Sequence, residues 1–229
     1  MKKLLPPIAA LVLCIGVLWG WTYGFTAYTV FSATLHQAGP VPREFPAIAC
    51  INQDSVLFNL RDKDKYVLLN FVYLNCPNVC HKVNYRLEDI YGALENDLVP
   101  NDLELVTVSF DLQNDDVRKL KNYRKLFEGD LSGWTFALPH GSTEAEFGSF
   151  LRQAGIWAYR LPENGIINHS VYIFLISPDH RVVRVFDPAR EDDAAILAGI
   201  RSCVKGTKAI AERAVLAANM IRLRRERGW

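Results

Sequence analysis

Apolar residues recur along the chain with two periods, which predict alternating strands and helices. Tyr66–Leu74 is a continuous apolar run and predicts a buried strand in the middle of a parallel sheet. From Val83 to Leu94 the apolar residues follow helical spacing. Further strands are expected at 103–110, 134–138, 171–176 and 182–186, with a hairpin over 48–60. Further helices are expected at 117–127, 142–155 and 190–204, with a second C-terminal helix running to about 225 after an interruption at Gly206.

The order of these elements predicts the fold class. Strands alternate with helices and end in a two-stranded hairpin, which indicates a layered α/β sheet with right-handed crossovers. The segment between the first long strand and its helix then lies at the carboxyl ends of the strands, where open α/β sheets place their sites. We expect a thioredoxin-like domain over 47–190, with added helices over 191–229.

The N-terminal segment predicts a membrane anchor over 1–31. Lys2 and Lys3 precede an apolar run of 18 residues, 4–21, and no charged residue follows before Arg43. Such a run can span a bilayer, and the two lysines favour an N-terminus in the cytoplasm. The remaining chain would then lie outside it, in a bacterial periplasm, beyond a Pro- and Gly-containing linker over 32–46. A cleaved signal peptide is the rival interpretation, but no small-x-small exit site is evident.

Charge and motif content remove several function classes. Lys+Arg 26 against Asp+Glu 25 gives a net charge of +1, and no basic patch is interleaved with aromatic residues, so nucleic acid is not an expected partner. The sequence contains no phosphate-binding Gly-rich loop, no His-Glu-x-x-His zinc motif and no Gly-x-Ser-x-Gly elbow.

Cys76 and Cys80 are the main candidates for chemistry. They follow the predicted central strand and lie four residues apart at the start of the predicted helix, on one face of it. The unpaired N–H groups and the dipole of a helix start lower thiol pKa values. The two sulfurs can form a disulfide, redox-active or structural, or bind one soft metal ion together.

A third ligand is needed for copper. Cu(I) favours soft ligands, and two thiolates with one imidazole would satisfy it. His169 precedes the strand expected at 171–176, which should run in the central sheet, so the imidazole could approach the cysteine pair. The alternative for His169 is a hydrogen-bonded histidine of the core.

Several stretches of the chain resemble the Sco/SenC family, the membrane-anchored copper chaperones that assemble the CuA centre of cytochrome c oxidase. These are the strand leading into Cys76-Pro77-x-x-Cys80, then Val108-Ser109-Phe110-Asp111, Asn168-His169-Ser170 and Pro178-Asp179, and together they cover about 45–190. The resemblance implies a thioredoxin-like fold and a copper site at Cys76, Cys80 and His169. The cargo would be Cu(I), with Cu(II) as the alternative.

Two residues depart from the family pattern. His81 stands where proline usually follows the second cysteine, and it is either an additional donor or a solvated residue. Asn168 stands where aspartate commonly precedes the histidine, which removes a charge near the imidazole. Asp111, at the end of a strand, is either a turn-forming residue or a residue that supports the site. The acids at 115–116 and 191–193 are expected at helix starts.

The resemblance implies a function with two alternatives. An anchored chaperone would pass copper to an oxidase subunit or another assembly factor by exchange of thiolate and imidazole ligands. A periplasmic thiol-disulfide oxidoreductase would instead reduce the cysteines of the copper-receiving partner, using Cys76 and Cys80 as its redox pair. A scaffold in oxidase assembly is a third class.

Cys50 and Cys203 allow two further interpretations. They could form a structural disulfide, since such bonds persist in the periplasm, or each could pack separately as a small apolar residue.

Overall fold

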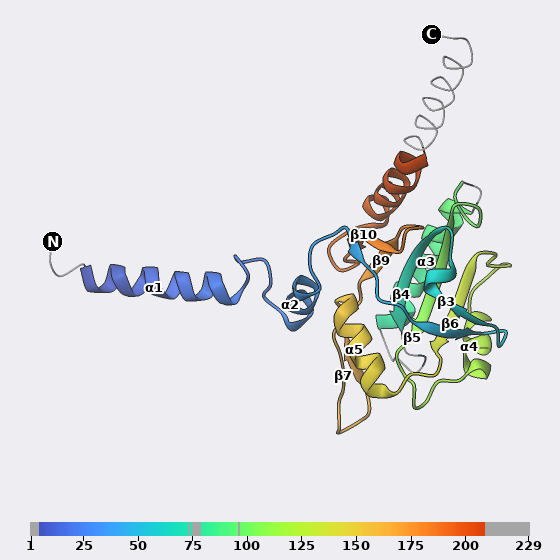
Figure 1. The fold of residues 1–229 in the computed structure, drawn as a ribbon, viewed down its shortest axis with the longest axis horizontal. Coiled ribbons are helices and arrows are strands. Elements are labelled where there is room, and N and C mark those ends of the chain that lie inside the picture. The colour runs from blue at the N-terminus through green and yellow to red at the C-terminus, as the bar shows by residue number, and fades with distance from the viewer. Residues whose placement is uncertain (1–4, 73, 75–78, 96, 209–229) are drawn as a thin grey trace, which may run out of the picture.

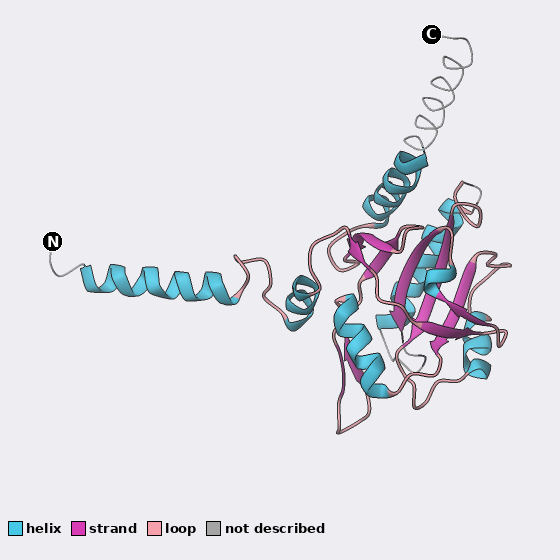
Figure 2. Cartoon of the chain, in the orientation of Figure 1, coloured by secondary structure: helices cyan, strands magenta, loops and turns pink. Residues whose placement is uncertain are grey.

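The structure is a computed structural model, and it describes residues 5–72, 74, 79–95 and 97–208 (Figure 1). Within these residues, eight strands form one sheet, in the order β1-β10-β9-β4-β5-β6-β2-β3, and two short strands form a separate pair (Figure 2). The large sheet comprises β1 (Arg43–Glu44), β2 (Ala49–Asn52), β3 (Leu57–Asn59), β4 (Tyr66–Val72), β5 (Leu103–Ser109), β6 (Trp134–Pro139), β9 (Ile173–Ile176) and β10 (Arg181–Phe186). The separate pair is β7 (Ala158–Arg160) and β8 (Ile167–His169).

Helices cover both faces of the sheet. The labelled helices are α1 (Leu5–Trp21), α2 (Val30–Gln37), α3 (Val79–Leu94), α4 (Val117–Arg124) and α5 (Glu144–Ala154), and a further helix occupies 193–208. Side chains of α5 join the core on one face of the sheet. Those of α3, α4 and helix 193–208 join the core on the other face. The result is the layered α/β fold that the sequence predicts.

β4 is the central strand, and all seven of its residues are buried. It pairs in parallel with β5 and antiparallel with β9. Leu69 and Phe71 belong to the core on the α5 side, and Leu68 belongs to the core on the α3 side, so successive side chains alternate between faces. Burial on both faces explains why the sequence here is continuously apolar.

Local signals in the sequence account for the other predicted elements. The hairpin predicted over 48–60 is present as β2 and β3, and the one predicted over 171–186 is present as β9 and β10. α5 begins at Thr143, whose hydroxyl accepts from the Glu146 N–H while Glu146 accepts from the Thr143 N–H. It ends at Gly155, which has φ 86, a left-handed conformation that glycine adopts without strain.

The predicted linker contains regular structure. Residues 30–37 form α2, whose first turn Thr29 caps, and residues 43–44 form β1, which pairs with β10 at the edge of the sheet. Phe31 of α2 contacts Trp157, with ring centroids 5.3 Å apart. This part of the chain therefore packs on the domain, although its Pro and Gly content is typical of a linker.

Two other details differ from the sequence prediction. β7 and β8 were not expected, because three-residue strands beside the polar turn 162–165 are too short to show alternation. The prediction that Gly206 interrupts the C-terminal helix is wrong, because helix 193–208 continues through it. A single glycine costs a helix only about 1 kcal/mol. The helix predicted beyond 208 lies outside the described residues.

α1 projects from the sheet (Figure 1) and has 17 residues. Its large apolar side chains are exposed, including Leu13 at 69% and Trp21 at 80%. Among the described residues, no helix combines the length and the apolar character that crossing a membrane requires. The predicted apolar run begins at residue 4, which lies outside the described part of the chain.

Candidate functional site

The cysteine pair belongs to the connection between β4 and α3. Cys76 lies outside the described residues. Cys80 falls in the first turn of α3, as the sequence predicts, while its side chain and that of His81 are also outside the described part of the structure. Of this connection the structure describes Leu74 and, from Val79 onward, the backbone of α3.

His169 is the last residue of β8 and is buried, with 9% of its surface exposed. Its Nδ1 lies 2.9 Å from the carbonyl oxygen of Ser170. A carbonyl can only accept a hydrogen bond, so Nδ1 donates, and in the neutral ring the lone pair is then on Nε2. Fixing one nitrogen in this way orients the ring and selects the tautomer, as is usual for histidines that bind metals.

The antiparallel pairing of β9 brings His169 to the site. Asn70, near the end of β4, is opposite Ile173 at the start of β9. His169 precedes that start by four residues. It therefore lies near the carboxyl end of β4, where β4 leads into the cysteine segment. Its ring is 4.6 Å from that of Phe110, whose N–H donates to the carbonyl oxygen of Val72 at 2.6 Å. His169 and the end of β4 are thus linked through one residue.

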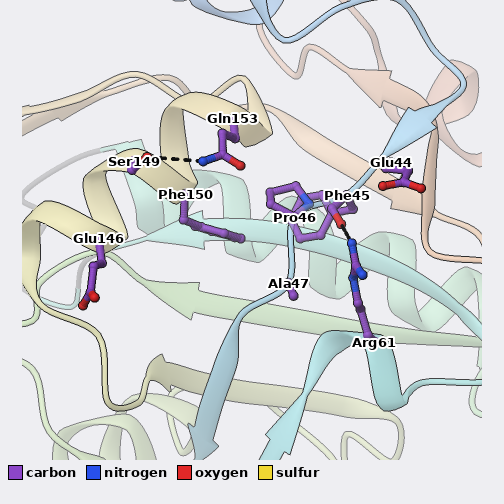
Figure 3. A pocket seen from close by; sticks show the side chains of 9 residues that line it. All are labelled: Glu44, Phe45, Pro46, Ala47, Arg61, Glu146, Ser149, Phe150 and Gln153. Atoms are coloured by element: carbon purple, nitrogen blue, oxygen red, sulfur yellow. Dashed lines mark hydrogen bonds between the residues drawn. The ribbon is translucent and has the colours of Figure 1, made fainter.

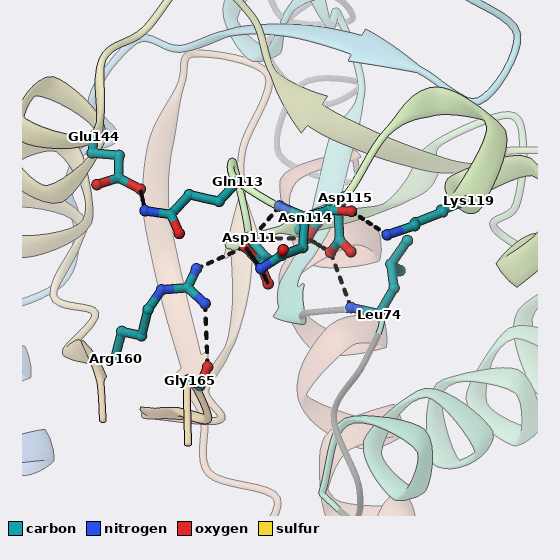
Figure 4. Close-up of polar contacts among 10 residues, drawn as sticks. Leu74, Asp111, Gln113, Asn114, Asp115, Lys119, Glu144, Arg160 and Gly165 are labelled. Carbon is teal, nitrogen blue, oxygen red and sulfur yellow. Dashed lines mark hydrogen bonds and ion pairs between the residues drawn. The ribbon is translucent and has the colours of Figure 1, made fainter. Parts of the chain in front are cut away.

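Asp111 connects this end of the sheet to the β7–β8 pair. Its carboxylate accepts from Arg160 Nη2 at 2.7 Å and from the backbone N–H of Asn114 at 3.1 Å (Figure 4). Burial alone would raise the pKa of Asp111, but the hydrogen bonds from Arg160 and Asn114 and the charge of Arg160 together lower it. Asp111 is therefore the turn-forming residue that the sequence allowed, and it also fixes Arg160 of β7.

Asp115 lies on the other side of the same loop (Figure 4). Its Oδ2 accepts from the N–H of Leu74 at 3.0 Å and from the Ser109 hydroxyl. Burial raises its pKa, and these two hydrogen bonds oppose the increase. The prediction that the acids at 115–116 lie at a helix start is confirmed at Asp116, which caps α4, whereas the Asp115 carboxylate contacts Leu74 and Ser109 instead. Sequence reasoning assigned no supporting role at the site to Asp115, Ser109 or Arg160, because their contacts depend on the tertiary fold.

The described residues contain no group of three or more His, Cys, Asp or Glu side chains arranged to hold a metal ion. Cys76 and the side chain of Cys80 lie outside the described part of the structure, so the ligand set stays a prediction. Cys50 and Cys203 are free thiols. They pack against the cores on opposite faces of the sheet, so the alternative of two separate thiols is confirmed.

A cavity of about 570 Å³ lies between α5 and the segment that follows β1 (Figure 3). Glu146 and Phe150 line it from α5, and Arg61 closes one side by donating to the Phe45 carbonyl at 3.2 Å. None of its lining residues is a predicted ligand, so this cavity is separate from the candidate site.

The family model described as SCO1/SenC matches residues 49–205, which is more than half of the chain. The chain belongs to the SCO1/SenC family. The matched range includes β4, the cysteine segment, the Asp111 loop and His169. The α/β sheet described above is therefore the thioredoxin-like fold of Sco proteins.

Individual relatives are distant from this Sco-family chain. The protein SCO2 homolog, mitochondrial, of Danio rerio is 28% identical over 148 residues, which cover 61% of this chain and 49% of that protein. The chain thus matches about half the length of that relative. The structure of Arabidopsis thaliana ScoI with copper bound gives a TM-score of 0.59 at 18% identity, covering 73% of this chain and 99% of the other.

A second solved structure is that of BsSco, a member of the Sco family of cytochrome c oxidase assembly proteins in which a disulfide switch was identified. Its TM-score is 0.61 at 21% identity, covering 73% of this chain and 96% of that chain. At these identities the two structures establish the shared fold.

Proposed function

We propose that this Sco-family chain is a copper chaperone that binds copper through Cys76, Cys80 and His169 and delivers it to the CuA centre of cytochrome c oxidase. The observation that carries the proposal is the position of His169, near the carboxyl end of β4, where β4 leads into the cysteine segment. The copper-bound structure of Arabidopsis thaliana ScoI, and the membership of BsSco in a family of cytochrome c oxidase assembly proteins, support it.

The ligand chemistry fits copper as cargo. Two thiolates and one neutral imidazole are soft to borderline donors, which suit Cu(I), and the hydrogen bond from Nδ1 to the Ser170 carbonyl leaves Nε2 as the donor atom. Transfer would proceed by replacement of these ligands, one at a time, by ligands of the receiving subunit. Both cysteines must be reduced for loading, so copper binding depends on the thiol redox state.

We also propose that residues 1–31 anchor the protein in the bacterial inner membrane, with the domain in the periplasm. The exposed apolar side chains of α1 support this, because water-exposed apolar surface is unfavourable and lipid would cover it. Anchoring would place the copper site next to a membrane-bound oxidase. Protease protection in spheroplasts tests it, and a domain cleaved only after cell lysis would contradict the periplasmic location.

Copper titration of the reduced full-length chain tests the ligand set. Cys76→Ser, Cys80→Ser and His169→Ala should each weaken copper binding by at least about tenfold, since each removes one ligand. Cys203→Ser and His140→Ala are the matched controls, because Cys203 is a free thiol away from this end of the sheet and His140 is exposed. Unchanged copper binding in the three site variants would refute the proposal.

The thiol-disulfide oxidoreductase is the second candidate. It is favoured by the position of Cys80 in the first turn of α3, where the helix start stabilises a thiolate, and by the disulfide switch named for BsSco. The two functions differ in their need for the imidazole. Oxidase assembly in cells that carry His169→Ala should fail if the protein carries copper, and should persist if it only reduces a partner.

A further inference from the structure

A groove of about 970 Å³ lies between α2 and the β9–β10 hairpin. We call it the α2–β10 groove. Leu35 and Val41 line it from α2 and the segment that follows, and Arg184 and Val185 line it from β10. His169 also lines it, so the groove extends to the candidate copper site.

The α2 wall of the groove is packed on the domain. At Gly155, a Cβ atom would come within 3.1 Å of both Leu35 and Ala38, so this end of α2 sits closely on the end of α5. Arg43 Nη2 donates to the carbonyl oxygen of Ala154 at 2.9 Å, which ties the segment after α2 to the same place. The groove is therefore a built feature of the fold.

The β10 wall of the groove offers an open sheet edge. β1 pairs with Arg181 and Val182 only, so among the described residues no strand lies on the outer side of Arg184–Phe186. An open edge of this kind can pair with an extended chain, which then gains backbone hydrogen bonds. The groove gives such a chain space beside the edge.

The charges that line the groove leave one cation unbalanced. Arg184 pairs with Glu191 at 3.3 Å, and Arg190 pairs with Asp187 at 3.4 Å. Arg43 has no acidic partner within the described chain; it donates to the carbonyls of Gly39 and Ala154, and its buried Nη1 has no hydrogen-bond partner. Arg43 is a half-buried guanidinium without a counter-charge, which is unfavourable, and a carboxylate in the groove would supply that charge.

We infer that the α2–β10 groove binds an extended acidic segment of a partner protein, which adds a strand to the open edge of β10 and places a carboxylate beside Arg43. A partner bound there lies next to His169. The partner that fits this position is the protein that receives the copper, and this identification alone rests on the proposed function; binding of the peptide does not require copper.

Fluorescence anisotropy with the full-length chain tests the inference. The probe is a labelled peptide of alternating valine and glutamate, about eight residues long, which matches the alternation of a strand. Arg43→Gln should weaken its binding by about tenfold, the usual effect of losing a charge-assisted hydrogen bond. Arg118→Gln is the matched control, because Arg118 is an exposed arginine of α4 that does not line the groove.

Two further measurements separate strand addition from simple charge attraction. A valine–lysine peptide, and a valine–glutamate peptide with alternate amides N-methylated, should both bind at least about tenfold more weakly. Hydrogen exchange should slow at residues 184–186 when the acidic peptide binds. Should Arg43→Gln fail to fold, the valine–lysine peptide and the N-methylated peptide still test the inference with the unmodified chain.

The inference is overturned if the acidic peptide fails to bind, if N-methylation or Arg43→Gln has no effect, or if vesicles of anionic lipid occupy the groove in place of the peptide. Its failure is distinct from failure of the copper proposal. Peptide binding that persists in His169→Ala supports the groove whatever the copper titration shows, and copper binding that persists in Arg43→Gln leaves the copper site standing.

Discussion

Asp111 and Asp115 lie four residues apart in one loop and are both buried, yet their surroundings shift their pKa values in opposite directions. Asp111 has a cation, Arg160, and the amide of Asn114. Asp115 has only the Ser109 hydroxyl and one backbone N–H, and its Oδ1 has no hydrogen-bond partner among the described residues. Burial raises the pKa of both carboxyls. At Asp111 the hydrogen bonds from Arg160 and Asn114 and the charge of Arg160 outweigh burial, whereas at Asp115 the two hydrogen bonds and the charge of Lys119 do not.

The two carboxylates also hold different chain segments. Asp111 fixes Arg160 of β7, which is opposite Ile167 of β8, two residues before His169. Asp115 fixes the N–H of Leu74, two residues before Cys76. One loop therefore supports both segments that carry the proposed copper ligands. Asp111 does so through an ion pair with Arg160, and Asp115 through a hydrogen bond from the backbone N–H of Leu74.

The largest effect is expected from removing the charged contact. Asp111→Ala should lower the free energy of unfolding by about 2–3 kcal/mol, because it leaves Arg160 without its carboxylate and Asn114 without its acceptor. The value is at the lower end for a buried pair, since the Arg160 side chain is 30% exposed. Urea unfolding followed by circular dichroism measures it. Asp64→Ala, at an exposed aspartate, is the control and should change stability by less than about 0.5 kcal/mol.

A smaller loss is expected at the Asp115 side. Ser109→Ala removes the hydroxyl that donates to the Asp115 carboxylate and should cost about 1–2 kcal/mol at pH 7. The loss should shrink in acid, because a protonated carboxyl no longer needs that donor. Urea unfolding at neutral and acidic pH measures both values, and a loss that is independent of pH would contradict this account of Asp115.

The smallest effect, and the sharpest contrast, is in the dependence of stability on pH. The pKa of Asp115 is raised above 3.8 in the folded state, so its contribution to stability falls as pH rises from 3.8 through the folded pKa. Asp111 has a lowered pKa, so its contribution is present above 3.8 and is lost as pH falls through the folded pKa. The two aspartates should therefore give opposite slopes.

Asp115→Asn tests this contrast. The variant should be within about 1 kcal/mol of the original chain at pH 7, and its stability relative to that chain should increase as pH rises above 3.8. Asp111→Asn should show the reverse trend. Chemical unfolding across the acidic range measures both, and slopes of the same sign would show that Arg160 does not separate the two carboxylates.

The sequence alone predicted the central part of the fold well. β4 was recognisable because burial on both faces demands a continuous apolar run, and α5 because Thr143 and Gly155 mark its two ends. His169 was selected from its place before a strand, and the antiparallel pairing of that strand with β4 explains why it reaches the carboxyl end of β4.

Other features depend on contacts between distant residues, which a sequence pattern does not reveal. α2 is stabilised by packing on Trp157 and Gly155, more than a hundred residues away, so its segment was predicted to be a linker. Arg160 meets Asp111 only because β7 folds back beside the loop. The structural disulfide considered for Cys50 failed for a related reason, since the sheet lies between the two thiols.

The reactivity of the Cys50 thiol reports whether the sheet is folded. Its thiol is completely buried in β2, and burial raises its pKa to about 12, so at neutral pH it is protonated and shielded from reagents. Alkylation of Cys50 therefore requires the sheet to open. Mass-resolved labelling at this position would distinguish opening of the sheet from a local change at the proposed copper ligands, without any added reporter group.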